Sequence, residues 1–476
     1  MRSAAPPTAP SPPLRMTEEA HARLRAWLLL VCTIVLLIAA GFRHAGDFES
    51  FYIAGTQFLK RLNPYSPELY QTYRSFGMSS LPPAIVLTCL PCLLPLYAAV
   101  PAWDIFCLLL WAASLYLWAE LLWDSPVDFP SFARLCAVGL IAPLCWAFTT
   151  HQVTVPVFFI ATFACWATRR QVHVGWAGVA AGLMLMKPHL TLLLAAALFL
   201  KSNRKLLFIT GMAAGLVLPY IPFMNMVRPV SDLRAWALTI KRQQTEVYYM
   251  DEQGLGSRLA SFFPIVTHAE AKTSKGPGIL IPKSRGRFLI RLKTAFWIAG
   301  ACIWGLWWRK TRNISALTLA SVPSATPSPA CTRERATPSE GQRPATRLAG
   351  PPDVWRGAVG EGTGEIGDLA VYAVALAWGL LISPYSHFYD GVLLTPLILL
   401  TFSSAGRSRE LTDLFPLFFG FNFTMVSLAV LARRYDFYLW PLMGWTSIAY
   451  CAFAASIYAW ANRPIFPLLC KGSGIR

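Results

Sequence analysis

Apolar runs separated by short polar stretches recur along most of this 476-residue chain. Many of them have about 17–25 residues, the length that an α-helix needs to cross a bilayer. A β-barrel would instead show short segments of alternating polarity. The pattern therefore predicts an all-α, polytopic helical membrane protein with about 11–13 membrane helices. The predicted membrane segments are 26–42, 84–100, 103–123, 132–149, 152–168, 174–187, 190–200, 204–224, 288–308, 369–384, 388–403, 411–432 and 437–460.

The polar stretches divide the chain into regions. A proline-rich start and a long Pro, Ser, Thr, Ala and Arg-rich stretch in the second half both lack an apolar period, which is typical of disordered segments. The predicted regions are a disordered cytoplasmic N-terminus (1–25), a membrane module (26–308) with outer loops 43–83 and 225–287, a disordered cytoplasmic linker (309–368), C-terminal membrane helices (369–462) and a cytoplasmic tail (463–476).

Arginine and lysine in short loops predict which side of the membrane each loop occupies. Basic residues before the first segment place the N-terminus inside, and the loop 167–173 also reads as inside. If every segment from 84 to 168 crossed fully, that loop would end up outside. We therefore expect 132–149 to dip into the membrane without crossing, and the acidic stretch 124–131 to lie outside.

Composition agrees with a membrane protein. Only 14% of the residues are charged and 55% are hydrophobic, whereas soluble domains have about 25% charged residues. The net charge of +18 fits basic cytoplasmic loops, and no nucleic-acid-binding motif accompanies it.

Most of the 11 cysteines lie within apolar runs, and the Cys89–Cys92 pair has no second pair nearby, so no metal site is predicted. The tryptophans are expected to face lipid or the membrane interface, among them Trp103, Trp111, Trp118, Trp307, Trp308, Trp440 and Trp445.

The first outer loop is not an ordinary polar loop. Its apolar residues recur at helical spacing from Phe48 to Leu62 and are followed by the turn "NPYSP". This predicts an interfacial amphipathic helix directly after two carboxylates, Asp47 and Glu49. A carboxylate at this position lies where a lipid headgroup would reach it.

Lys187 interrupts another pair of apolar runs. The segments 174–187 and 190–200 are short for crossings and meet at Lys187-Pro188. Proline disrupts a helix, and irregular backbone at membrane depth persists only where protein buries it or where it lines a wet cavity. Ionisable residues within such segments are functional candidates. This predicts a cavity at 187–189.

Four motifs in order resemble a known family. "DFESFYIAG…LNPYS" from Asp47, "THQVTVPVFF" from Thr150, "GLMLMKPHLTLLL" from Gly182 and "LLISPYSHFYDGVLLTPL" from Leu380 together look like the GT-C superfamily, and more narrowly glycosyltransferase family 87. Two motifs depart from the family pattern. Gly-Gln-x-Asn becomes His151-Gln152-Val-Thr154, and Lys-Pro-Gln becomes Lys187-Pro188-His189.

The resemblance implies a GT-C-like fold and transfer of a hexose, typically mannose, from a polyprenyl phosphate to a hydroxyl of a glycan or glycolipid acceptor. It implies an active site on the outer face of the plasma (inner) membrane, and Asp47 as the catalytic base. One carboxylate suffices for a single inverting displacement, because a phosphate leaves without protonation, unlike the alcohol released by a glycosidase. A solvated aspartate is a weak base, with a pKa near 3.9, and burial at the bilayer edge would raise that pKa.

The remaining polar residues suit the other needs of this reaction. The expected phosphate-binding residues are Lys187, His189 and His387, and the expected sugar- or acceptor-binding residues are Glu49, Tyr52, His151, Gln152, Tyr385 and Asp390. No cofactor or metal is expected, because the acidic pair of the first outer loop, Asp47 and Glu49, is an Asp-x-Glu and no DxD motif occurs. Two alternatives remain open at this point: a transporter or lipid flippase, and a non-catalytic assembly protein on the same scaffold.

Overall fold

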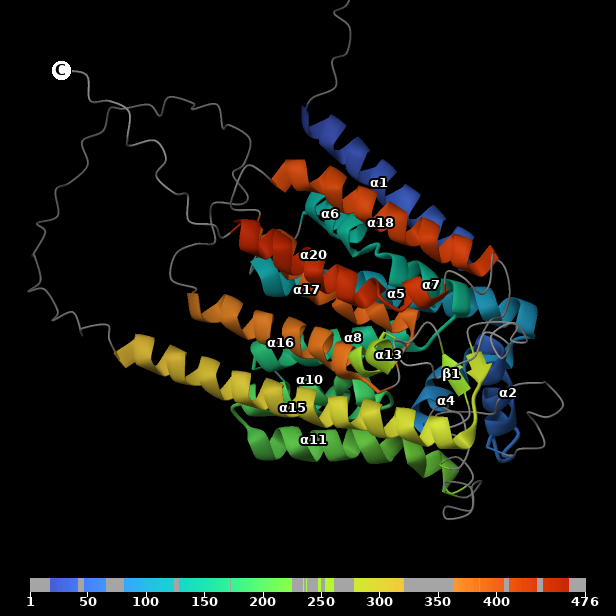
Figure 1. Ribbon diagram of the computed structural model, residues 1–476. Helices are drawn as coiled ribbons and strands as arrows, with labels where there is room; N and C mark the ends of the chain where they lie inside the picture. The colour runs from blue at the N-terminus through green and yellow to red at the C-terminus, as the bar shows by residue number, and fades with distance from the viewer. Residues whose placement is uncertain are drawn as a thin grey trace, which may run out of the picture.

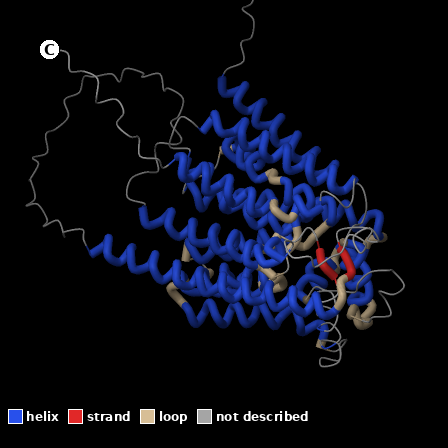
Figure 2. Tube along the Cα trace, viewed as in Figure 1, coloured by secondary structure: helices blue, strands red, loops and turns tan. Residues whose placement is uncertain are grey.

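The computed structural model forms a bundle of helices that lie side by side along a common direction (Figure 1). At one end of the bundle α2 lies across the ends of the other helices, and we call this the α2 end. The two short strands lie near the same end (Figure 2). The structure describes residues 18–41, 47–65, 81–123, 128–171, 173–224, 234, 237, 247–249, 253–260, 278–320, 363–384, 386–405, 411–434 and 440–461.

Within these ranges the chain is helical almost throughout, as the hydropathy pattern predicts. The helices of the first half are α1 (Glu18–Gly41), α2 (Phe48–Leu59), α4 (Pro82–Thr88), η1 (Pro91–Leu93), α5 (Leu96–Trp123), α6 (Phe129–Gly139), α7 (Ala142–Thr150), α8 (Thr154–Arg169), α9 (Val174–Met184), α10 (Pro188–Lys201), α11 (Lys205–Val217) and η2 (Leu218–Phe223). Those of the second half are α13 (Leu255–Ala260), α15 (Lys283–Ala320), α16 (Thr363–Ile382), η3 (Phe388–Leu394), α17 (Thr395–Ala405), α18 (Leu411–Arg434), α19 (Trp440–Met443) and α20 (Thr446–Ala461).

Several of these helices have the length and composition of membrane spans. In the described part of the chain, Leu96–Leu122, Lys205–Phe223 and Ser284–Arg309 pass both criteria. A further seven apolar helices have 10–17 residues each. The protein is thus an all-α polytopic membrane protein, but the expected number of about 11–13 crossings depends on helices shorter than the usual span of about 20 residues.

The prediction that 84–100 crosses the membrane as one helix is wrong. Residues 82–95 form the seven-residue helix α4 and the turn η1, and the long helix α5 begins only at Leu96. The prolines at 82, 83, 91 and 95 explain the break, because proline is accepted in the first turn of a helix but not in its interior. Both short elements lie beside α2 at the α2 end (Figure 1).

The segment 132–149, which we expected to dip into the membrane without crossing, forms two helices that lead from the side of Trp27 to Asp47 at the α2 end. Helices α6 and α7 meet at an angle of 76°. The ring of Trp27, near the start of α1, lies 4.7 Å from that of Phe129, at the start of α6. Arg170, after α8, donates to the carbonyl of Glu120 near the end of α5. Residues 128–131 therefore lie at the same end of the bundle as the first half of α1 and the end of α8, which contradicts the expectation that the acidic stretch 124–131 faces the opposite side. Residues 124–127 lie outside the described residues.

Three of the tryptophans predicted to face lipid are in the core. Trp103, Trp111 and Trp118 of α5 are fully buried. They recur at intervals of seven or eight residues, so they share one face of the helix, and this face packs against α8. The expectation holds better elsewhere, since Trp307 and Trp445 are 37% and 36% exposed. Composition alone does not distinguish the lipid-facing side of a helix from the side that packs on other helices.

Helices α9 and α11 approach each other unusually closely. A Cβ added to Gly178 or Gly182 would lie 2.2 Å from a carbonyl oxygen of α11, and one added to Gly211 or Gly215 would lie 2.1 Å from a carbonyl oxygen of α9. Both helices thus present a Gly-x-x-x-Gly face, which allows the backbones of membrane helices to touch. This pairing places α9, and with it the start of α10, in the bundle.

The loop 225–287, predicted to lie outside, contains the two strands of the described residues. Strand β1 (Val247–Tyr249) pairs antiparallel with β2 (Gly278–Leu280). Between them Gln253 and α13 pack into the bundle. The Gln253 backbone N–H donates to Ser386, its side-chain amide donates to Met443, and its side-chain oxygen accepts from the Ser447 N–H. This fully buried side chain joins the loop to two segments of the second half.

The boundaries of the predicted linker also change. Helix α15 continues to Ala320 and α16 begins at Thr363, so helix occupies both ends of the stretch 309–368. Residues 321–362, most of the N-terminal region 1–25 and the tail 463–476 lie outside the described residues. The first membrane helix begins at Glu18, earlier than the predicted residue 26.

Candidate active site

A sharp turn between α7 and α8 forms the centre of the site. Helix α7 ends at Thr150, His151 adopts the left-handed conformation with φ 52° and ψ 46°, and α8 begins at Thr154. The left-handed residue reverses the chain within a few residues, so that consecutive side chains point to different neighbours. We call residues 150–154 the α7–α8 turn.

Asp47 contacts this turn through Thr150 and Gln152. Its backbone N–H donates to the carbonyl of Thr150 at 3.1 Å, and the side-chain amide of Gln152 donates to its carboxylate. The next residue, Phe48, is fully buried and stacks on Trp103 with ring centroids 5.5 Å apart. These contacts fix the start of α2. Asp47 itself is exposed, so the protein alone does not bury this carboxylate as the sequence argument required.

Lys187 and Asp390 contact the turn through Thr154. The Lys187 ammonium lies 2.6 Å from Asp390 Oδ1 and 2.7 Å from Thr154 Oγ1, and the Thr154 hydroxyl donates to the same carboxylate oxygen at 2.8 Å. The side chains of Lys187 and Asp390 are 13% and 2% exposed. Lys187 sits just before α10, whose first residue is Pro188, so the predicted break in the helix is confirmed.

Two histidines surround this ion pair. His387 caps η3: its N–H donates to Asp390 Oδ2 at 2.9 Å, and its side chain accepts from the Asp390 backbone. His189 is close enough to Asp390, Lys187 and His387 to interact electrostatically with each of them. The ring of Tyr389 stacks on His387 at 5.2 Å and lies 5.0 Å from the Lys187 ammonium. The three residues predicted to bind phosphate therefore gather around one carboxylate.

His151 has a partner that sequence reasoning missed. Its Nδ1 lies 2.8 Å from Asp104 Oδ1, and its side chain is fully buried. Its backbone carbonyl accepts from the indole N–H of Trp103 at 3.2 Å. Asp104 is a carboxylate inside the longest apolar run before residue 130, and this isolation in an apolar helix was the signal that could have identified it.

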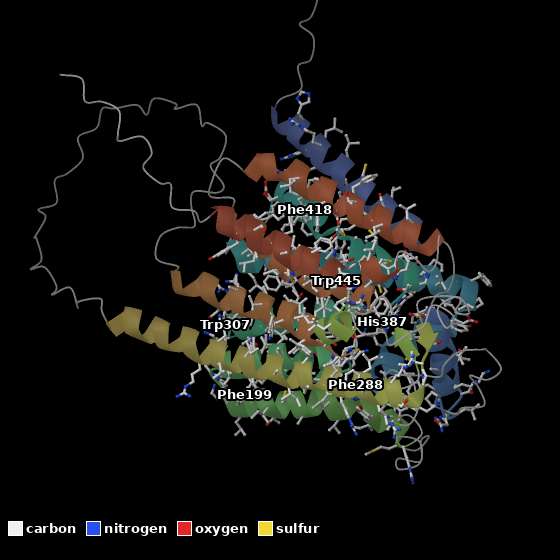
Figure 3. All side chains as sticks on the ribbon, viewed as in Figure 1. Phe199, Phe288, Trp307, His387, Phe418 and Trp445 are labelled. Atoms are coloured by element: carbon white, nitrogen blue, oxygen red, sulfur yellow. The ribbon has the colours of Figure 1, made fainter. Side chains whose placement is uncertain are left out.

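The site therefore brings together residues from five separate parts of the chain at the α2 end. His387 lies in this part of the bundle in Figure 3, whereas Trp307 lies toward the opposite end. Asp47 and Lys187 are both joined to the α7–α8 turn, as a shared pocket requires. Among the residues that the structure describes, no three His, Cys, Asp or Glu side chains are placed to hold one metal ion.

Comparison with known families gives this arrangement its context. A model of glycosyltransferase family 87 matches residues 82–327, which is more than half of the chain. The chain belongs to glycosyltransferase family 87. No curated protein and no solved structure matches it. As a member of this family it is a glycosyltransferase, with a sugar donor and an acceptor, and the family does not support the transporter and assembly-protein alternatives.

The region shared with family 87 holds only part of the site. It includes Asp104, the α7–α8 turn and Lys187, but Asp47 precedes it and His387 and Asp390 follow it. Contacts from the turn link the shared region to both flanks.

The two departures from the family motif in this turn can be explained by their contacts and backbone conformation. His151 stands where the motif has glycine and adopts left-handed backbone, and the Thr154 hydroxyl supplies polar contacts where the motif has asparagine.

Two other predicted contacts of this family 87 glycosyltransferase, Glu49 and Tyr52, lie on α2. Glu49 is exposed on α2. The hydroxyl of Tyr52 donates to the carbonyl of Leu94 at 2.9 Å, which ties α2 to the chain after η1. Tyr385 lies outside the described residues. The structure thus groups Asp47, Gln152, Lys187, His189, His387 and Asp390 with His151, and leaves Glu49 and Tyr52 on the helix that covers this end.

Proposed function

We propose that this glycosyltransferase moves a hexose, mannose by family resemblance, from a polyprenyl phosphate to an acceptor hydroxyl, with inversion at the anomeric carbon and Asp47 as the base. One observation carries the proposal. The α7–α8 turn bonds Asp47 through Gln152 and bonds Lys187 and Asp390 through Thr154. A carboxylate and a cationic group are thus held by two residues of one short turn, Gln152 and Thr154.

This arrangement suits a single displacement. The acceptor hydroxyl gives its proton to the Asp47 carboxylate as its oxygen forms a bond to the anomeric carbon. The bond from that carbon to the phosphate oxygen breaks, and its electron pair leaves with the polyprenyl phosphate. Because this leaving group departs without a proton, a second carboxylic acid is not needed. A positioned base contributes about 10²–10⁴-fold to such a step.

The leaving phosphate would bind on the Lys187 side. An ammonium has three donors, and Thr154 and Asp390 use two of them. Asp390 compensates the charge of a largely buried lysine and holds it in place, since an unpaired buried charge is costly. His387 and His189 flank the pair and can donate to phosphate oxygens. The developing negative charge would then meet groups already oriented toward it.

Basic residues support an outer-face site. Arg23 and Arg25 of α1 and Arg169 and Arg170 at the end of α8 lie at the end of the bundle opposite α2. Positive residues favour the cytoplasmic side, and this supports a location of the α2 end at the outer face of the plasma membrane. There the headgroup of a polyprenyl-phosphate sugar and a glycan or glycolipid acceptor would both be accessible.

The test is transfer of radiolabelled mannose from polyprenyl-phosphate mannose to endogenous acceptors in membranes containing the protein. We expect Asp47→Asn to lower the rate about 10²–10⁴-fold. Asp128→Asn is the matched control, because it makes the same chemical change at the opposite end and asparagine also caps a helix N-terminus well. Full transfer by Asp47→Asn would exclude Asp47 as the base. Transfer from nucleotide mannose alone would exclude the lipid-linked donor.

A further inference from the structure

The conformation of His151 makes the α7–α8 turn possible. Its φ of 52° lies in the left-handed region, which glycine adopts freely and which other residues adopt at an energetic cost. Such a residue persists where its surroundings hold it. Two residues that follow it in the turn, Gln152 and Thr154, make the contacts to Asp47 and to the ion pair. Any relaxation at His151 would therefore move both halves of the site.

Two contacts join His151 to helix α5. Asp104 Oδ1 lies 2.8 Å from His151 Nδ1, and the indole of the preceding residue, Trp103, donates to the His151 carbonyl at 3.2 Å. Both residues lie on α5, and both contacts join α5 to the turn. The imidazole is fully buried, whereas the Asp104 side chain is 20% exposed. This geometry directs the imidazole into the protein, toward α5.

We propose that Asp104 is a positioning residue for sugar transfer: by pairing with His151 it holds the left-handed turn that aligns Asp47 with the Lys187 phosphate site. The inference rests on the proposed function for its catalytic consequence. It assigns His151 to the support of the turn, in place of the sugar contact expected from the sequence. Asp104 acts through His151 and touches neither Asp47 nor Lys187 in any contact found in the described residues.

The proposal predicts that the effects of Asp104→Ala and His151→Gly on the rate are not additive. Asp104→Ala leaves the buried imidazole without its carboxylate, and a displacement of about 1 Å in a catalytic group can cost about 10²-fold in rate. In a His151→Gly background the turn no longer needs a held imidazole, because glycine takes the left-handed conformation unaided. Whatever His151→Gly costs by itself, adding Asp104→Ala should then change the rate less than about 2-fold.

The experiment is a double-mutant cycle on purified full-length protein. The kcat and the donor KM are measured for wild type, Asp104→Ala, His151→Gly and the double variant. Because the turn also carries Thr154, we expect Asp104→Ala to raise the donor KM as well as to lower kcat. A mere loss of folded protein would lower the apparent kcat and leave KM unchanged. Asp104→Asn retains a hydrogen-bonding partner for the imidazole and should recover most of the rate.

Two results would overturn the proposal: wild-type kinetics in Asp104→Ala, or the same large loss from Asp104→Ala in both backgrounds. The second would mean that Asp104 acts directly on substrate. A parallel cycle on the melting temperature tests the pairing without any reaction. If that cycle is non-additive but wild type transfers no sugar from polyprenyl phosphate, the proposed function fails and the pairing stands. If transfer occurs and both cycles are additive, the inference fails and the function stands.

Discussion

Lys187 and Asp390 are 203 residues apart in the chain, yet the ammonium of one lies 2.6 Å from a carboxylate oxygen of the other. The lysine comes from the break between two apolar helices and the aspartate from the first turn of η3. Both side chains are largely buried. A buried pair of opposite charges is tolerated because each partner compensates the other, so losing one partner is costly.

We therefore expect Asp390→Asn to lower the free energy of unfolding by about 3 kcal/mol, because it leaves the Lys187 charge buried without its counter-charge. The double variant Lys187→Met/Asp390→Asn should be more stable than Asp390→Asn alone. Thermal unfolding of the detergent-solubilised protein measures both effects. If the loss in the double variant equalled the sum of the losses in Lys187→Met and Asp390→Asn, the two charges would not depend on each other.

The ion pair between Lys201 and Asp368 is the matched control. It joins α10 to α16 toward the other end of the bundle, and its side chains are 33% and 37% exposed. Exposed pairs contribute about 0–1 kcal/mol. Asp368→Asn should therefore change the melting temperature little, which separates the effect of burial from the effect of removing any ion pair.

Thr154 provides a second prediction, because its hydroxyl joins the turn to the ion pair. Thr154→Val keeps the shape but removes both hydrogen bonds, each to a charged group. Such bonds contribute about 1.5–3 kcal/mol each. Since about 1.4 kcal/mol corresponds to a factor of ten, we expect the donor KM to rise about 10-fold or more. Thr154→Ser retains the hydroxyl and should stay near wild type. Equal KM values for the Val and Ser variants would show that the hydroxyl has no part in donor binding.

The glycine face between α9 and α11 gives a third prediction. In Gly182→Ala the new methyl group would lie 2.2 Å from the Met212 carbonyl oxygen, so the helices must separate. Overpacking of this kind costs about 1–3 kcal/mol, more than the gain of about 1 kcal/mol in helix propensity. Gly305→Ala in α15 is the control, since nothing lies within 4 Å of its added Cβ. We expect a lower melting temperature for the first variant and an unchanged or higher one for the second.

Gln253 gives a fourth prediction, because it fastens the outer loop to the second half of the chain. Gln253→Ala leaves the Ser447 N–H and the Met443 carbonyl without their partners in a buried place. Each buried group left unsatisfied costs about 1–3 kcal/mol. We expect a lower melting temperature and faster proteolysis within 225–287. Gln253→Glu keeps an acceptor for the Ser447 N–H, so it should be less sensitive to protease than the alanine variant, and the reverse order would contradict this account.

The last prediction concerns the membrane topology. Because Phe129 packs beside Trp27, we expect Asp128→Cys and Gln171→Cys to react with an impermeant maleimide only from the side of the N-terminus. Glu49→Cys on α2 should react only from the other side. Mass-spectrometric mapping identifies the labelled cysteine among the native ones. Labelling of Asp128→Cys and Glu49→Cys from the same side would contradict the bent crossing by α6 and α7.

Local properties of the chain were readable from the sequence. Apolar runs define helices, because a backbone in lipid must satisfy its own hydrogen bonds. For the same reason Pro188 marks a true break, and the spacing from Phe48 onward predicts α2. Lys187, His189, His387 and Asp47 stood out because ionisable groups beside apolar runs need a reason to be there. Their gathering at one end of the bundle agrees with that reasoning.

Contacts between distant segments were decided only by the tertiary structure. The length of a run does not reveal whether it forms one continuous helix, as α5 does, or two helices bent by 76°, as α6 and α7 do. Nor does composition reveal that Trp103 faces protein, or that Asp104 pairs with His151. Hydrophobicity is the same on a lipid-facing and a protein-facing side of a helix, and a hydrogen bond depends on where two side chains meet in space. The sequence therefore determined the helices and the candidate ionisable residues, and packing alone determined which of those residues share a site.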